Sequence, residues 1–215
     1  KESGVSPESL GVSGSLLIGL HTQESDLDLT VHGEESCRAV HRALVDLLRE
    51  GGNVDLQRLS GESMHVHYKE RLADTHMALN DFILAENRKV NQGLFRGRTY
   101  FIRFLKTRKE IGERYGDRRY VPLGRITIRG TVTSDRESIF TPCIYPLKNV
   151  RELGSGLARD VAEIVSFRGR FCEQAKAGEE IQAAGTLEQV RSLDGRTWQR
   201  LLLGNDPKDV MLLRR

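Results

Sequence analysis

The sequence predicts an α+β protein in two parts: residues 1–118 with a mixed sheet and helices, and residues 119–215 with a β-rich, barrel-like pattern. Three observations support this expectation. Apolar residues alternate with a period of two over residues 26–32, and an amphipathic helical stripe follows over residues 34–50. From about Tyr120 onward, short β-like runs are separated by turn residues.

The first sixty residues are expected to run strand, turn, strand, helix, strand. Residues 10–13 form a short strand pattern, and residues 15–20 resemble the first turns of a helix. The alternation over residues 26–32 predicts a strand with one apolar and one polar face. The stripe over residues 34–50 predicts a helix that ends at paired glycines, and residues 54–59 read as another strand.

The remaining elements are expected as follows. His65 and His67 share one face of a predicted strand, residues 69–90 look helical, and residues 100–105 fit either a strand or a helix. Five β-like runs then cover residues 125–133, 139–147, 164–172, 181–190 and 197–203. A small barrel of the oligonucleotide-binding type is one architecture that such a series can form.

Composition is ordinary for a globular protein, with 38% hydrophobic and 29% charged residues. No apolar run approaches the roughly 20 residues that a transmembrane helix needs, so we expect no membrane partner. The three cysteines, Cys37, Cys143 and Cys172, fit neither a zinc spacing nor a disulfide framework. A reducing, cytoplasmic location is therefore expected.

Charge is unevenly distributed along the chain, although the net charge is only +3. Residues 1–60 contain ten acidic and five basic residues, whereas residues 96–129 contain eleven basic and three acidic residues. This asymmetry predicts a divided site, with metal on the acidic side and phosphate on the basic side. RNA or another nucleic acid is an expected partner of the basic segment 96–129.

Asp26 and Asp28 are the first candidate catalytic residues. Residues i and i+2 of a strand point to the same side, so these two carboxylates lie about 7 Å apart along the chain. Mutual repulsion is relieved by a hard cation such as Mg²⁺ or Mn²⁺, for which carboxylate oxygens are suitable ligands. Asp55 offers a third carboxylate if its strand lies alongside, enough for two metals. A solvated strand face and an ordinary strand-end acid are the alternatives.

Gly14 and Ser15 are the candidate phosphate-binding residues. Glycine lets the backbone approach a ligand closely, and a helix beginning there directs free N–H groups at an anion. The Ser15 hydroxyl adds a further donor. Phosphates at this turn and metal at Asp26 and Asp28 would together hold a nucleoside triphosphate.

The arrangement of Gly14-Ser15, Gly19 and then Ser25-Asp26-Leu27-Asp28-Leu29 resembles the signature of the polymerase-beta-like nucleotidyltransferase superfamily. The similarity covers residues 10–60 and extends to uncharacterised archaeal proteins described only as predicted nucleotidyltransferases. It implies a nucleotidyltransferase-like sheet and Mg²⁺-dependent transfer of a nucleoside monophosphate from an NTP to an acceptor hydroxyl. It also implies that Asp26, Asp28 and Asp55 are metal ligands and catalytic, and that Gly14, Ser15 and Ser25 bind the nucleotide.

One stretch departs from the family pattern. Minimal members often read Gly-Ser-Arg-Ala-Arg-Gly, whereas residues 14–19 read Gly-Ser-Leu-Leu-Ile-Gly. The phosphate charge must then be neutralised from elsewhere, for which the segment 96–129 is the candidate. A non-catalytic nucleotide- or RNA-binding module on the same fold is the alternative function.

Overall fold

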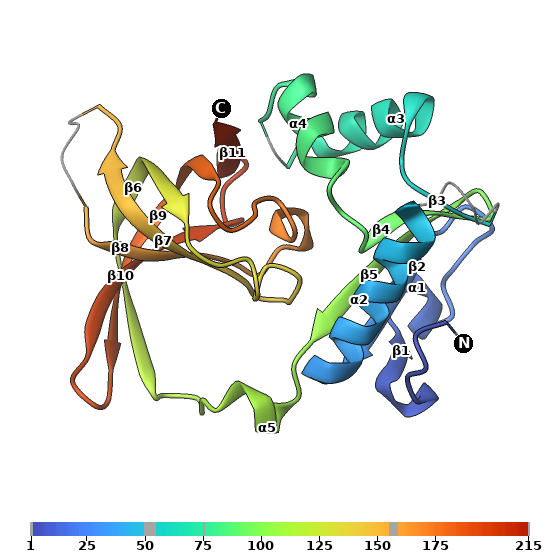
Figure 1. Cartoon of the computed structure of the whole chain (residues 1–215), viewed down its shortest axis with the longest axis horizontal. Coiled ribbons are helices and arrows are strands. Elements are labelled where there is room, and N and C mark those ends of the chain that lie inside the picture. The colour runs from blue at the N-terminus through green and yellow to red at the C-terminus, as the bar shows by residue number, and fades with distance from the viewer. Residues whose placement is uncertain (1, 50–54, 75, 155–158, 215) are drawn as a thin grey trace. The chain divides into compact units, whose positions relative to one another are not determined.

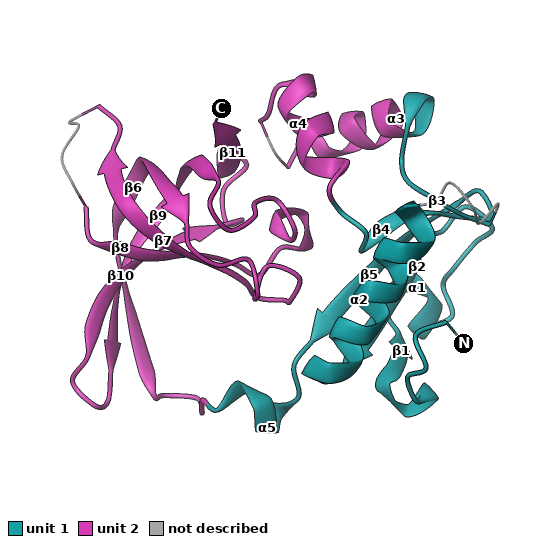
Figure 2. Ribbon diagram, viewed as in Figure 1, with its two compact units in different colours: residues 1–63, 89–112 teal, residues 64–88, 113–215 magenta. Residues whose placement is uncertain are grey.

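The computed structural model describes residues 2–49, 55–74, 76–154 and 159–214, which form an α+β chain (Figure 1). The chain divides into two compact units that do not follow a single boundary in the sequence (Figure 2). Unit 1 contains residues 1–63 and 89–112, and unit 2 contains residues 64–88 and 113–215. The boundary expected at residues 118 and 119 falls at the start of a long strand of unit 2.

Unit 1 is built on a mixed sheet, as predicted, and this sheet has five strands. Its strands are β1 (Leu10–Val12), β2 (Leu27–His32), β3 (Leu56–Gln57), β4 (Gln92–Phe95) and β5 (Arg98–Leu105). Their order is β1-β2-β5-β4-β3, with β2 and β5 parallel and every other neighbouring pair antiparallel. A 3₁₀ turn, η1 (Pro7–Ser9), precedes β1, and a single helical turn, α1 (Gly14–Leu17), follows it.

Helix α2 (Glu34–Arg49) covers one face of this sheet. Val31 of β2 and Phe104 of β5 are buried there, and the His41 ring meets the Phe104 ring edge-on at 6.0 Å. The Cys37 thiol of α2 donates a hydrogen bond to the Val31 carbonyl at 3.2 Å. Burial raises the pKa of Cys37 to about 11, so this thiol is a packing residue with little nucleophilic character.

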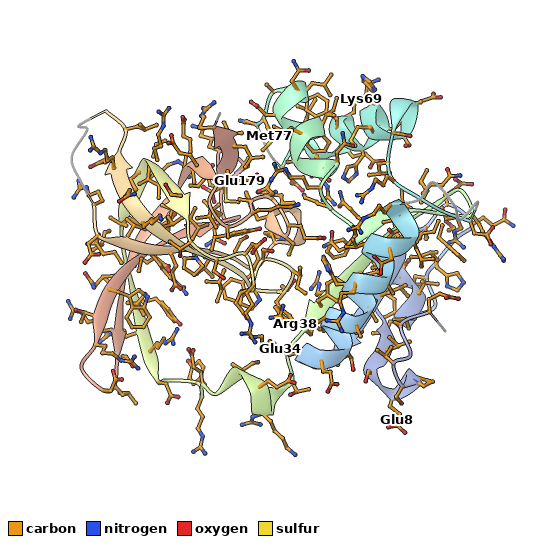
Figure 3. The ribbon with its side chains drawn as sticks, in the orientation of Figure 1. Glu8, Glu34, Arg38, Lys69, Met77 and Glu179 are labelled. Carbon is orange, nitrogen blue, oxygen red and sulfur yellow. The ribbon has the colours of Figure 1, made fainter. Side chains whose placement is uncertain are left out.

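The α2 N-terminus is joined to the short helix α5 (Arg108–Ile111) through one carboxylate. Glu110 accepts the Thr107 N–H at 2.7 Å and the Glu34 N–H at 3.0 Å, so it satisfies orphan donors at two helix starts. Glu34 in turn pairs with Arg38 at 2.8 Å, and the two side chains lie together on α2 (Figure 3). The backbone hydrogen bonds to Thr107 and Glu34 hold the pKa of Glu110 below its ordinary value.

We expect Glu110→Gln to lower stability by less than about 1 kcal/mol at neutral pH, the usual scale for an exposed charge at a helix start. The folded-state pKa of Glu110 is lowered, so its contribution is present above the unfolded pKa of about 4.3 and is lost as pH falls through the folded value. Urea unfolding of both proteins at pH 7 and pH 3 measures this. A stability difference that is equal at the two pH values would contradict the assignment.

Two helices of unit 2 replace the single helical region expected over residues 69–90. They are α3 (Gly61–Arg71) and α4 (Leu79–Glu86), with α3 beginning in unit 1. His65 and His67 lie on α3, so the expected strand at these residues is wrong. The His67 ring contacts Glu86 of α4 at 3.4 Å and the Phe82 ring at 5.6 Å, which makes it part of the helix–helix contact.

The helices attach to the rest of unit 2 through specific polar contacts. Arg88 donates two hydrogen bonds to Glu179, at 2.6 and 2.8 Å. The Arg88 guanidinium lowers the pKa of Glu179, which favours the charged form of the pair. The backbone N–H of His76 also bonds the Pro207 carbonyl at 3.2 Å. These contacts explain why residues 64–88 group with the C-terminal part of the chain.

Unit 2 contains a closed five-stranded barrel, which confirms the β-rich, barrel-like prediction. Its strands are β6 (Arg118–Val132), β7 (Cys143–Glu152), β8 (Val161–Ser166), β9 (Glu180–Ser192) and β10 (Thr197–Leu203). They run in the order β6-β7-β8-β10-β9, and β9 pairs back with β6. Only β8 and β10 are parallel among these pairs. A sixth strand, β11 (Val210–Arg214), which the sequence pattern did not reveal, pairs with β9.

The barrel interior is a packed apolar core. Ile128, Ile164, Ile181 and Leu201 are fully buried within it. Tyr145 is also buried, but its hydroxyl donates to the Phe171 carbonyl at 2.6 Å in the 3₁₀ turn η2 (Gly169–Phe171). The interior is therefore filled by side chains, as expected for a barrel with this few strands.

Candidate active site at the Gly14 turn and strand β2

Strand β2 presents its carboxylates on the face of the sheet opposite helix α2. Val31 faces α2 and is 2% exposed, so Asp28, an odd number of residues away, points to the other side. Register places Asp28 beside Phe101 of β5. The neighbouring side chains of β5 on this face are Thr99 and Arg103, and neither is acidic.

The Gly14 turn lies directly against Asp28. The Ser13 N–H donates to the Asp28 carbonyl at 2.8 Å, which fixes the turn at this level of β2. Gly14 has a φ of +59°, and a Cβ there would lie 3.0 Å from the Asp28 Cγ and nearer still to Oδ2. Glycine is required for both the backbone conformation and the close approach. The two halves of the predicted motif are thus in contact.

Asp26 lies just before β2 and has a defined partner. The Thr99 hydroxyl of β5 donates a hydrogen bond to Asp26 Oδ1. Asp26 is exposed and Asp28 is partly buried. This hydrogen bond from Thr99 orients the Asp26 carboxylate. The second carboxylate oxygen, Oδ2, can then act as a metal ligand.

Ser25, a predicted nucleotide-binding residue, makes local hydrogen bonds in the structure. Its hydroxyl accepts the Thr22 N–H at 2.9 Å and lies 3.3 Å from the Thr22 hydroxyl, so it closes its own turn. Arg98 donates to the Ser25 carbonyl at 2.6 Å and to the Thr22 carbonyl at 3.3 Å. Arg98 therefore positions the segment that leads into Asp26. In the sequence, the only indication that Arg98 belongs to the site was its position within the basic segment 96–129.

The helix expected over residues 15–20 is a single turn. Ser15 is partly buried, and its carbonyl accepts the Leu20 N–H at 3.0 Å, while Gly19 adopts a φ of +69° that ends the helix. A helix this short has little macrodipole, so any anion here would rely on individual backbone N–H groups. Leu17, Ile18 and Leu20 are 64%, 66% and 73% exposed. Leu16 and Ile18 stand at the two positions where minimal members of the superfamily that residues 10–60 resemble often carry arginine.

Asp55 is not brought to the other two aspartates. It precedes β3, the edge strand, which is separated from β2 by β4 and β5, or about 14 Å at the usual strand spacing. Its carboxylate pairs with Arg96 at 3.1 Å. Among the residues that the structure describes, no three acidic, histidine or cysteine side chains form a metal-binding group.

The basic segment 96–129 is divided between the two units, and several of its charges are already neutralised. Arg96 pairs with Asp55, and Lys106 with Glu34 at 3.4 Å. In unit 2, Arg125 pairs with Asp209 at 2.5 Å. These three charges are therefore already balanced by acidic partners.

Comparison with known proteins adds one relative. The chain is 32% identical over 204 residues to an uncharacterised protein of Methanocaldococcus jannaschii. The aligned region covers 95% of this chain and 57% of that protein, so the chain spans little more than half of the relative's length. No family model matches the chain. No solved structure matches it either.

Across the part of the chain that the structure describes, no helix has the length and apolar character required to cross a bilayer.

Proposed function

We propose that the chain is a nucleotidyltransferase whose active site lies at the Gly14 turn, Asp26 and Asp28. The observation that carries the proposal is the contact between the Gly14 backbone and the Asp28 carboxylate. It places a backbone suited to phosphate beside a carboxylate suited to a cation. The relative's name states no activity, so the proposal depends on this site and on the family resemblance of residues 10–60.

The donor set fits Mg²⁺ or Mn²⁺ only when substrate completes the coordination. Asp26 and Asp28 provide carboxylate oxygens, and Mg²⁺ in nucleotide sites is usually bound by one or two carboxylates together with substrate phosphates. When bound, the cation would neutralise charge that develops on the phosphates. Asp55 is left out of this set because it lies at the other edge of the sheet.

The chain's own residues would bind and orient the reactants. Backbone N–H groups of the Gly14 turn and the Ser15 hydroxyl would hold the β- and γ-phosphates. Arg103, on the same sheet face and two residues beyond Phe101, would supply the charge that the turn lacks. The acceptor oxygen would form a bond to the α-phosphorus, the bond to pyrophosphate would break, and the acceptor's proton would leave to solvent.

The test is a screen of α-phosphate-labelled NTPs with Mg²⁺ or Mn²⁺ against RNA, protein and small-molecule acceptors. The double variant Asp26→Asn with Asp28→Asn serves as the blank. Transfer by the wild type and its loss in the double variant is the expected result. Equal transfer by both proteins would show that this site is not the catalyst.

A non-catalytic nucleotide- or RNA-binding module is the second candidate. It is favoured by the exposed Leu17, Ile18 and Leu20 beside the turn and by the separation of Asp55 from the other acids. The five-stranded barrel is also an architecture used to bind oligonucleotides, although fold alone does not assign function. RNA binding that depends strongly on salt and is unaffected by EDTA would support this candidate.

A further inference from the structure

Unit 2 carries a three-stranded ribbon where β6, β9 and β10 continue beyond the closed barrel, and the β9–β10 hairpin projects in Figure 1. On one face of this ribbon the side chains contact and pair with one another. Val190 lies opposite both Tyr120 and Trp198 and is fully buried. Arg200 covers the Tyr120 ring at 3.9 Å while bonding Glu188 at 2.8 Å. These side chains contact one another on this face, although Tyr120 remains 40% exposed.

The opposite face carries two arginines side by side. Arg119 of β6 and Arg191 of β9 are direct cross-strand partners, and both are exposed. Such partners have Cβ atoms about 5 Å apart, and like charges at this spacing are destabilising. Within the described residues, neither arginine forms an ion pair or hydrogen bond through its side chain. The ribbon therefore holds two positive charges together without neutralising either.

Other arginines near this pair do have acidic partners. Arg118, one residue before Arg119, pairs with Glu113, and Arg196 of the hairpin pairs with Asp194 at 2.6 Å. Acidic partners are thus available to adjacent positions of the same ribbon but not to the Arg119–Arg191 pair.

An exposed aromatic side chain lies in the turn that precedes Arg119 in the chain. The turn over residues 114–117 is closed by Asp117, which accepts the Arg114 N–H at 2.7 Å through its side chain. The Leu193 N–H bonds the Asp117 carbonyl at 3.0 Å, so the turn is joined to the strand end that follows Arg191. Tyr115 lies within this turn and is fully exposed. A fixed backbone thus presents an open aromatic ring.

We propose that the Arg119–Arg191 pair binds backbone phosphates of a single-stranded nucleic acid and that Tyr115 stacks on a base. Guanidinium groups match phosphate geometry, and two held together offer a site whose repulsion a phosphate would relieve. Aromatic rings beside basic groups are the usual elements of single-strand recognition. Register places Gln189, Gln199 and Thr197 on the same face together with the partly buried Val121, so most of the neighbouring side chains on this face are polar.

This inference deepens the second candidate function by locating the nucleic-acid surface within unit 2. It does not depend on catalysis at Asp26 and Asp28. Variants of the ribbon and variants of the carboxylates therefore test the two proposals separately.

The experiment measures binding of a fluorescently labelled 12-nucleotide single-stranded RNA to the intact chain by anisotropy over a range of KCl. We expect Arg119→Gln with Arg191→Gln to weaken binding at least tenfold at low salt. The slope of log affinity against log salt should fall by about 1.4, or 0.7 for each lost phosphate contact on a single strand. Tyr115→Ala should weaken binding about tenfold and leave the salt slope unchanged.

Arg196→Gln is the matched control, because it removes the same charge from the same hairpin at a position already paired with Asp194. We expect less than a twofold change. The double arginine variant should melt at the same temperature as the wild type or higher, since a repulsive pair is removed. The proposal is overturned if the wild type binds no single-stranded RNA at low salt, if the double variant binds normally, or if Arg196→Gln is equally weakened. Stronger pair-dependent binding to phosphatidylserine vesicles than to RNA would also overturn it.

Discussion

Gly14→Ala is expected to reduce nucleotidyl transfer about a hundredfold while lowering stability by only roughly 1–2 kcal/mol. The stability loss reflects a non-glycine residue at a φ of +59°. The activity loss reflects the added Cβ, which would overlap the Asp28 carboxylate and displace it by an appreciable fraction of an ångström. Misplacement of reacting groups on this scale can cost about a hundredfold in rate. Steady-state transfer and urea unfolding measure the two effects.

Gly19→Ala is the control for this prediction. Gly19 also has a left-handed backbone, with a φ of +69°, but a Cβ there would meet no atom within 4 Å. Both variants should therefore lose similar stability, and only Gly14→Ala should lose most of its activity. Equal loss of activity in both would mean that the contact with Asp28 is irrelevant to function.

Asp209→Asn is expected to destabilise unit 2 by about 3–5 kcal/mol, the range for removing one partner of a buried charge pair. The Asp209 side chain is 0% exposed, and its Oδ1 accepts from Arg125 at 2.5 Å. Its Oδ2 accepts three backbone N–H groups, from Gly204, Asn205 and Asp206, at 2.8, 3.0 and 3.1 Å. An asparagine that keeps these three bonds must direct its amide donors at the arginine.

Thermal unfolding of the intact chain measures this effect, and the expected fall in Tm is roughly 6–20 °C for a chain of this size. Asp194→Asn makes the same chemical change in an exposed turn, where Asp194 pairs with Arg196 in solvent, and should leave Tm nearly unchanged. A Tm for Asp209→Asn within 2 °C of the wild type would contradict the proposed role of this carboxylate.

Local elements were predictable where a periodic pattern was long. The helix over residues 34–50 and the strand over residues 26–32 appear as α2 and β2 because their apolar spacing matches the buried face. The helix predicted after Gly14, over residues 15–20, is longer than the single turn that the structure shows. Gly19 ends it in a left-handed conformation, a signal that was present in the sequence but was interpreted only as part of the motif.

The order of strands in the unit 1 sheet could not be predicted from local sequence patterns, and this order determines which acidic residues meet at the candidate site. The sequence places Asp55 on the next strand along the chain, but the neighbours of β2 in the sheet are β1 and β5, and β5 lies some seventy residues after β2. Because long-range pairing is decided by packing of whole elements, the position of Asp55 did not follow from its own context. Gly14 and Asp28 were expected at one site, and they meet there because β1, which precedes Gly14, pairs with β2.

The most direct test compares label transfer from the α-phosphate of NTPs by Asp26→Asn, Asp28→Asn and Asp55→Asn, each with a circular dichroism spectrum to confirm folding. The structure separates these residues into an adjacent pair and a distant acid bound to Arg96. We predict that either change in the pair lowers transfer about 10²- to 10³-fold, as expected for several kcal/mol of lost electrostatic stabilisation, while Asp55→Asn remains within a few-fold of the wild type. Wild-type transfer by Asp28→Asn, or a loss confined to Asp55→Asn, would contradict the account.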